Sequence, residues 1–147
     1  MTDFKDSKGR VWTLKLTLGS AKEIYDRLGI DLLNPAKLAE GDESIVSRLA
    51  YDLLLVGDIL SVLLEKQRQE RDVENLLDDF DGETCAAASD AFLTEYERFF
   101  TDQKNPRAAS VVRLIREVGD EVRSGETSSG SPDAPESQIT PTSPSTN

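Results

Sequence analysis

The chain opens with an alternation of apolar and polar positions that predicts a β-hairpin over about residues 3–18. Phe4-Lys5 and the stretch 11–18 flank the segment 6–10, which is rich in turn-forming residues. A period of two along the second strand predicts one buried face. A two-stranded hairpin is marginal alone, so we expect helices or another chain to cover that face. Its residues are Trp12, Leu14, Leu16 and Leu18.

Beyond the hairpin, apolar residues recur every three or four positions over about residues 21–123, which predicts a series of helices. Ser20 and Glu23 fit a capping box for a first helix over 21–28, and Gly29 fits its end. Asn105-Pro106 marks the start of the last helix. The remaining helical segments are expected over 34–41, 43–51, 53–71, 73–80 and 84–100.

The segment from Leu53 to about Arg71 predicts the core helix. It is apolar over most of its circumference, which is typical of a helix packed by neighbours on several sides. Gly57 inside it costs about 1 kcal/mol relative to alanine, and a close approach by a neighbouring element would explain it. The main apolar stripe is Leu53, Val56, Leu60, Leu63 and Leu64.

The composition changes at Ser124, where a tail begins. Residues 124–147 hold seven Ser, four Thr, four Pro and two Gly, with Ile139 as the only bulky aliphatic residue. Such a segment cannot bury enough apolar surface to offset the entropy of ordering it. We therefore predict one folded domain over residues 1–123 and a disordered, acidic tail over 124–147. The expected fold class is α+β, mainly α-helical, with the N-terminal hairpin packed on a small helical bundle.

Charge and composition narrow the function. The 147 residues include 28 acidic and 17 basic side chains, a net charge of -11, no histidine and one cysteine. Histidine-dependent catalysis and imidazole-bound metal are excluded, as are an internal disulfide and a thiolate zinc site. An acidic chain is also a poor match for a phosphate backbone. With no export signal at the N-terminus and no apolar run of membrane-spanning length, we expect a cytoplasmic binding protein rather than an enzyme.

The acidic loop around Gly82 is the first candidate for chemistry. An EF-hand needs a glutamate six residues after the glycine, and Ala88 stands there. Asp78, Asp79, Asp81 and Glu83 are therefore interpreted as a solvated, helix-capping loop. Cys85 is interpreted as a small buried hydrophobe, since no histidine is present to activate it. Without a phosphate-binding glycine motif, no catalytic residue, cofactor, metal or small-molecule substrate is predicted.

Aromatic side chains are the remaining candidates, and we consider two roles for them. Core packing is the more common role. The alternative is a groove for a partner helix, because the predicted helices carry much apolar surface for a small domain. The candidate partner-binding residues are Trp12, Tyr25, Tyr96, Phe99 and Phe100.

The order of these segments resembles that of the tail assembly chaperones of long-tailed, siphovirus-like phages and prophages. The resemblance covers about residues 4–120. It lies in the opening FKDSKGRVWTLKLT, the LGIDLL step at 28–33, the apolar helix VGDILSVL at 56–63, and the Phe99-Phe100 helix end with the helix after Asn105-Pro106. The family has no catalytic signature.

This resemblance implies a non-enzymatic chaperone that binds the long, helical tape measure protein and keeps it soluble. It also implies recruitment of tail tube protein, followed by release before the tail is complete. The expected location is the bacterial host cytoplasm, with the protein absent from the mature virion. Self-association is a further candidate interaction, whereas nucleic acid and membrane are not expected partners.

Two readings from other classes stay open. A structural virion protein, such as a head–tail connector or tail completion protein, would remain in the purified particle. An acidic regulator that mimics DNA would carry its carboxylates as one continuous stripe. In this sequence the carboxylates are spread among basic residues, which makes the DNA mimic the weaker of the two.

Overall fold

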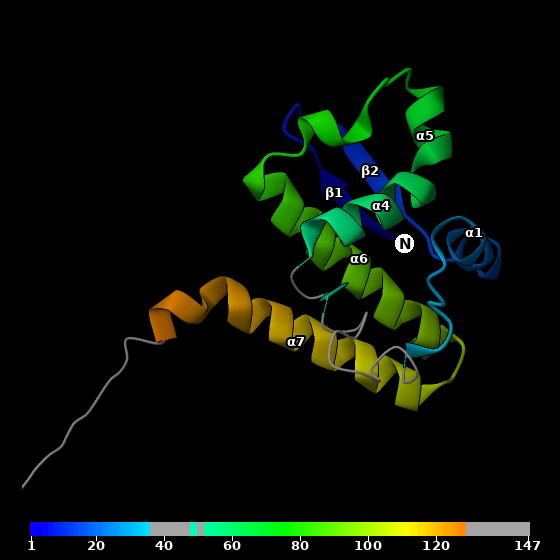
Figure 1. The fold of residues 1–147 in the computed structure, drawn as a ribbon, viewed down its shortest axis with the longest axis vertical. Helices are drawn as coiled ribbons and strands as arrows, with labels where there is room; N and C mark the ends of the chain where they lie inside the picture. The colour runs from blue at the N-terminus through cyan, green and yellow to red at the C-terminus, as the bar shows by residue number, and fades with distance from the viewer. Residues whose placement is uncertain (36–47, 50–51, 129–147) are drawn as a thin grey trace, which may run out of the picture.

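The fold is α+β and mainly helical, with an antiparallel two-stranded hairpin at its N-terminus (Figure 1). A computed structural model describes residues 1–35, 48–49 and 52–128. Its elements are β1 (Thr2–Lys5), β2 (Val11–Leu14), α1 (Leu18–Leu28), α4 (Leu53–Leu63), α5 (Glu65–Glu70), the 3-10 helix η1 (Leu76–Asp79), α6 (Gly82–Asp102) and α7 (Pro106–Ser128).

The hairpin forms as the alternation predicts, but it is shorter. Phe4 pairs with Trp12 across the two strands, and Gly9 adopts φ 80°, a left-handed conformation that favours glycine in the connecting turn. Trp12, Leu14 and Leu16 are buried. Leu18 was expected on the same face and is exposed, because β2 ends at Leu14 and Leu18 already belongs to α1.

α1 begins earlier than the sequence suggested, and a different residue caps it. Thr17 is the N-cap: its Oγ1 accepts a hydrogen bond from the Ser20 N–H at 3.1 Å, while Ser20 Oγ accepts one from the Thr17 N–H at 2.9 Å. The capping box therefore joins Thr17 and Ser20 rather than Ser20 and Glu23. The predicted end is correct, since Gly29 caps the helix with φ 73°.

The predicted core helix over 53–71 is two helices. α4 ends at Leu63, the buried Leu64 forms the junction, and α5 follows. α5 covers the free edge of β2: the Thr13 N–H donates to Gln67 Oε1 at 3.1 Å, and Gln67 Nε2 donates to the Thr13 carbonyl at 2.6 Å. A glutamine amide thus supplies hydrogen bonds to a strand edge that would otherwise be free to pair with another strand.

α6 is the central helix of the fold. It packs against α7, both strands and α4, and Figure 1 shows α7 lying alongside it. Asp81 caps α6 by accepting the Thr84 N–H at 2.9 Å, as the acidic loop predicted. Asn105 caps α7 in the same way through the Ala108 N–H at 3.2 Å. The core gathers around α6, and its largest fully buried side chains include Trp12, Tyr96, Phe92, Phe100, Ile59 and Leu60.

The C-terminal end of the folded part differs from the sequence prediction. α7 continues to Ser128, so residues 124–128, which were assigned to the tail, belong to a helix. The rest of the predicted tail, 129–147, lies outside the described residues. Most of the helices predicted over 34–41 and 43–51 and the region between α1 and α4 also lie outside them.

Candidate functional site

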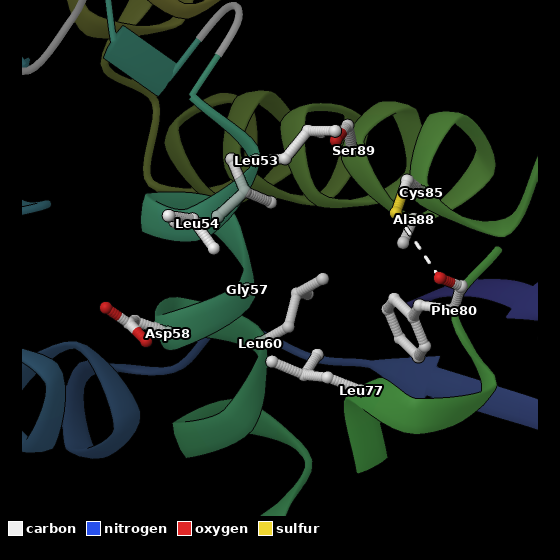
Figure 2. Close-up of a pocket in the computed structure, with 11 residues that line it drawn as sticks. Leu53, Leu54, Gly57, Asp58, Leu60, Leu77, Phe80, Cys85, Ala88 and Ser89 are labelled. Atoms are coloured by element: carbon white, nitrogen blue, oxygen red, sulfur yellow. Dashed lines mark hydrogen bonds between the residues drawn. The ribbon is translucent and has the colours of Figure 1, made fainter. Parts of the chain in front are cut away.

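An apolar pocket opens where α4, η1 and the start of α6 meet, and we call it the α4–η1 pocket (Figure 2). Its volume is about 180 Å³. Among its lining residues only Asp58 and Ser89 contribute polar side chains. Leu60 extends from α4 into the space and Leu77 reaches from η1 toward α4, whereas Asp58 points away (Figure 2). The lining residues are Leu53, Leu54, Val56, Gly57, Asp58, Leu60, Leu77, Phe80, Cys85, Ala88 and Ser89.

Gly57 has no side chain and therefore leaves space on the α4 side of this pocket. A Cβ added there would lie 3.4 Å from Leu77 Cδ1 and 3.8 Å from Leu77 Cδ2, with no other neighbour within 4 Å. These are ordinary van der Waals distances, so the fold has room for a methyl group at this position. The close approach that the sequence suggested is therefore a contact with one flexible leucine, and the absent side chain contributes space to the pocket.

Leucines at the pocket rim are unusually exposed. Leu54 is 82% exposed and Leu77 38% exposed, and Leu53 is exposed as well. Leu53 was expected in the core stripe. It is the first residue of α4 and is 54% exposed. Isolated exposed leucines are common in proteins, but here three lie around one apolar hollow, which is typical of a binding surface.

The two segments that line the pocket carry acidic residues and no basic ones. Residues 52–60 and 74–90 contain eight Asp or Glu and no Lys or Arg. Two of the eight are paired, since Asp52 binds Arg48 and Asp79 binds Lys8 and Arg10. The other six are exposed and form no ion pair within the described residues. They are Asp58, Glu74, Asp78, Asp81, Glu83 and Asp90.

Cys85 lies on the α6 wall of the pocket and is partly buried. Its thiol contacts the Phe80 carbonyl oxygen at 3.8 Å (Figure 2). The sequence predicted a small buried hydrophobe, whereas the structure leaves Cys85 partly exposed at the apolar pocket. As the chain's single cysteine, it gives the pocket a chemical label.

Three of the five predicted partner-binding aromatics belong to the core. Trp12, Tyr96 and Phe100 are buried, so in this structure they cannot contact a partner. The Tyr96 hydroxyl donates to the Leu32 carbonyl, and burial raises the pKa of this phenol well above its usual range. Phe99 is partly buried and packs edge-on against Phe100, with ring centroids 5.3 Å apart.

Tyr25 is the one predicted aromatic with a largely free surface, at 55% exposure. It lies in a second, shallower hollow with Leu18 and Leu33, and Lys22 and Asp31 also line this hollow. The structure therefore does not bring the five candidates together. The α4–η1 pocket uses none of them, because its apolar surface is mainly aliphatic.

Asp6 anchors the hairpin through a fully partnered carboxylate. Oδ1 accepts the N–H groups of Lys8 at 2.9 Å and Arg10 at 3.0 Å, and Oδ2 accepts Arg10 Nε at 2.8 Å and Trp12 Nε1 at 2.9 Å. Burial acts to raise the pKa of Asp6, but the hydrogen bonds from Trp12 and Arg10 outweigh it and hold the pKa below its ordinary value. Arg71 also lies over the Trp12 ring, 4.8 Å from its centroid.

Glu95 performs the same task where the hairpin meets α6. Its fully buried carboxylate accepts the Leu16 N–H at 2.8 Å, the Thr2 hydroxyl at 3.2 Å and Arg98 Nε at 2.9 Å. Burial acts to raise its pKa, and the bonds from Arg98 and Leu16 lower it below the ordinary value. Sequence periodicity gave no sign of this residue, because its partners lie far away along the chain.

Two other features, a metal site and a membrane-spanning helix, are absent from the described part of the chain. Within residues 1–35, 48–49 and 52–128, no group of three or more Cys, Asp or Glu side chains is placed to hold a metal ion. Among the helices that the structure describes, none combines the length and apolar character that crossing a bilayer requires.

Comparison with known proteins gives no match: no family model, no curated protein and no solved structure resembles this chain closely enough to be assigned. The α4–η1 pocket is therefore judged on its own geometry. Three neighbouring leucines at residues 53–55 were the sequence signal that could have located it. One helix turn buries only part of such a run when it packs on one side, which leaves the rest for another surface.

Proposed function

We propose that this protein is a non-enzymatic tail assembly chaperone of a long-tailed phage or prophage, acting in the cytoplasm of the bacterial host. It binds the tape measure protein, keeps it soluble and helps recruit tail tube subunits. The α4–η1 pocket is the observation that carries the proposal. It offers exposed leucines and a space for an apolar side chain on an otherwise well-packed domain, which suits the groove mode of helix recognition.

Two further observations support a binding role. The chain has no histidine, and the buried carboxylates Asp6 and Glu95 are fully engaged in holding the hairpin. The chain has a net charge of -11. When it binds an aggregation-prone helical protein, this charge makes the complexes repel one another and keeps them in solution.

Co-expression tests the proposal directly. The chain is produced with the longest helical protein encoded just downstream in the same genome, and the lysate is analysed by size-exclusion chromatography. We expect the long protein to be soluble only in the presence of this chain, and the two to co-elute. A long protein that stays insoluble, or that is soluble and elutes separately, contradicts the chaperone role.

A structural virion protein, such as a head–tail connector or tail completion protein, is the alternative to exclude. Mass spectrometry of purified particles separates the two roles, because a chaperone is shed before the tail is complete. Stoichiometric amounts in the finished particle would replace the chaperone proposal with the structural one.

A further inference from the structure

We propose that the occupant of the α4–η1 pocket is an amphipathic helix with one large apolar side chain flanked by Lys or Arg. This inference rests on the proposed function, because it takes the partner to be a helical polypeptide. It adds the chemistry of the contact: an apolar anchor that enters beside Gly57, and a basic border that meets the unpaired acids on the segments that line the pocket.

The size of the pocket supports a single anchor. Its volume of about 180 Å³ is comparable with that of an apolar engineered cavity, about 150 Å³, that holds a benzene molecule. One leucine, methionine or phenylalanine side chain fits such a space. Gly57 leaves it open on the α4 side, and the exposed Leu54 and Leu77 flank its mouth.

The acidic residues of this protein indicate which residues should surround the anchor on the partner helix. Six exposed acids in residues 52–60 and 74–90 have no ion-pair partner within the described residues, and these two segments contain no Lys or Arg. A basic border on the partner helix would satisfy them. Complementary charge of this kind speeds encounter and rejects wrong partners, while the apolar anchor supplies most of the affinity.

The same charges argue against occupants from this chain. A twofold dimer formed through this face would bring two identical sets of these acidic segments together. Residues 129–147 hold Asp133 and Glu136 and no basic residue, and residues 36–47 hold three acids against one lysine. A basic helix from another protein is the occupant that reduces the repulsion.

Two synthetic helices test the proposal on the full chain. Each has about 18 residues, or five turns, with leucines along one face. One carries lysines at the remaining positions and the other carries glutamates, and a third peptide keeps the lysines but replaces the leucines with serine. Binding is measured by fluorescence anisotropy, and pocket occupancy by the protection of Cys85 from alkylation.

We expect the leucine–lysine helix to bind about tenfold or more tightly than the leucine–glutamate helix at low salt, and to slow Cys85 alkylation. Raising the salt should slow its association but leave it bound through the apolar anchor. The serine–lysine peptide should leave Cys85 unprotected. Equal affinity for both leucine helices, or protection by the serine–lysine peptide, would overturn the proposal.

Matched variants locate the contact. Leu54→Ser should weaken binding of the leucine–lysine helix, whereas Leu114→Ser, the same change at a 61% exposed leucine on α7, should not. Asp58→Asn with Asp78→Asn should reduce the preference for lysine more than Asp3→Asn with Glu117→Gln, which removes the same charge elsewhere. Equal effects within either pair of variants contradict the assignment of the site.

The tests separate this inference from the proposed function. Specific binding of the leucine–lysine helix combined with failure of co-expression would retain the pocket chemistry and reject the tape measure protein as its partner. Successful co-expression that is insensitive to Leu54→Ser would retain the chaperone and reject the pocket. A concentration-dependent dimer that Leu54→Ser dissociates would make a second copy the occupant, and so overturn the inference.

Discussion

The hairpin and the α4–η1 pocket differ in which side chains they bury. The hairpin contacts bury hydrogen-bonded carboxylates, whereas the pocket leaves leucines exposed. In the hairpin, Asp6 and Glu95 are buried and each carboxylate oxygen accepts hydrogen bonds. The segments that line the pocket carry exposed leucines and also acids without ion-pair partners within the described residues. Both regions are rich in acidic residues, so composition does not distinguish them.

The difference teaches how to separate structural from functional surface in a chain of this kind. Buried polar groups cost free energy unless they are hydrogen-bonded, so a fully bonded carboxylate is explained by the stability of the fold. Exposed apolar side chains around a hollow do not stabilise the isolated domain. Contact with a partner is the physical explanation for them. Four tests, from the largest expected effect to the smallest, challenge this distinction.

The largest effect compares two leucines on α4. Leu60→Asp should unfold the domain, because Leu60 is 1% exposed and an unpaired buried carboxylate costs several kcal/mol. Leu54→Asp, six residues earlier on the same helix, should change the free energy of unfolding by no more than about 0.5 kcal/mol. Urea denaturation followed by circular dichroism measures both. A cooperatively folded Leu60→Asp variant would show that the core is misplaced.

Glu95→Gln should destabilise the fold by about 2 kcal/mol at pH 7, the contribution typical of hydrogen bonds to a charged group. The pKa of Glu95 in the folded chain lies below its ordinary value of 4.5. Its contribution is therefore present well above pH 4.5 and is lost as the pH falls through the lower folded value. Unfolding free energies measured from pH 7 down to acid should decline less steeply for the variant. A parallel decline for both chains contradicts the role given to Glu95.

Trp12→Phe tests the other buried carboxylate. It removes the indole N–H that donates to Asp6 Oδ2 and keeps an aromatic ring in the core. We expect a loss of about 1 kcal/mol, because Arg10 still donates to the same oxygen. Adding Asp6→Asn to this variant should cost less than Asp6→Asn costs in the original chain. Additive losses in that double-mutant cycle would show that the two residues are not coupled.

Gly57→Ala should stabilise the fold slightly, an effect opposite in sign to the losses above. Alanine is favoured over glycine in a helix by about 1 kcal/mol, and the added Cβ meets only Leu77 at ordinary contact distance. The unfolding temperature should rise slightly, while the leucine–lysine helix should bind more weakly because the pocket is shallower. A variant that is both more stable and an equally good binder would exclude Gly57 from the binding surface.

Much of the fold was predictable because its signals are local. The period of two before Leu16 placed the hairpin, and Asp81, Gly29 and Asn105 marked helix ends through contacts with residues a few positions away. Competition between neighbouring signals produced the errors. Thr17 and Ser20 both suit a cap, and their reciprocal hydrogen bonds moved the start of α1 to Leu18.

The sequence by itself determined the mainly helical α+β class, the buried hairpin face and the acidic character of the chain, because these depend on residues near one another or on composition. Only the tertiary structure decided which apolar residues remain outside the core. The α4–η1 pocket exists because residues 53–60 and 77–89 meet in space. Likewise, Glu95 matters because folding brings it to Leu16, 79 positions away. Periodicity shows which residues share a face, whereas packing between elements determines whether that face is covered.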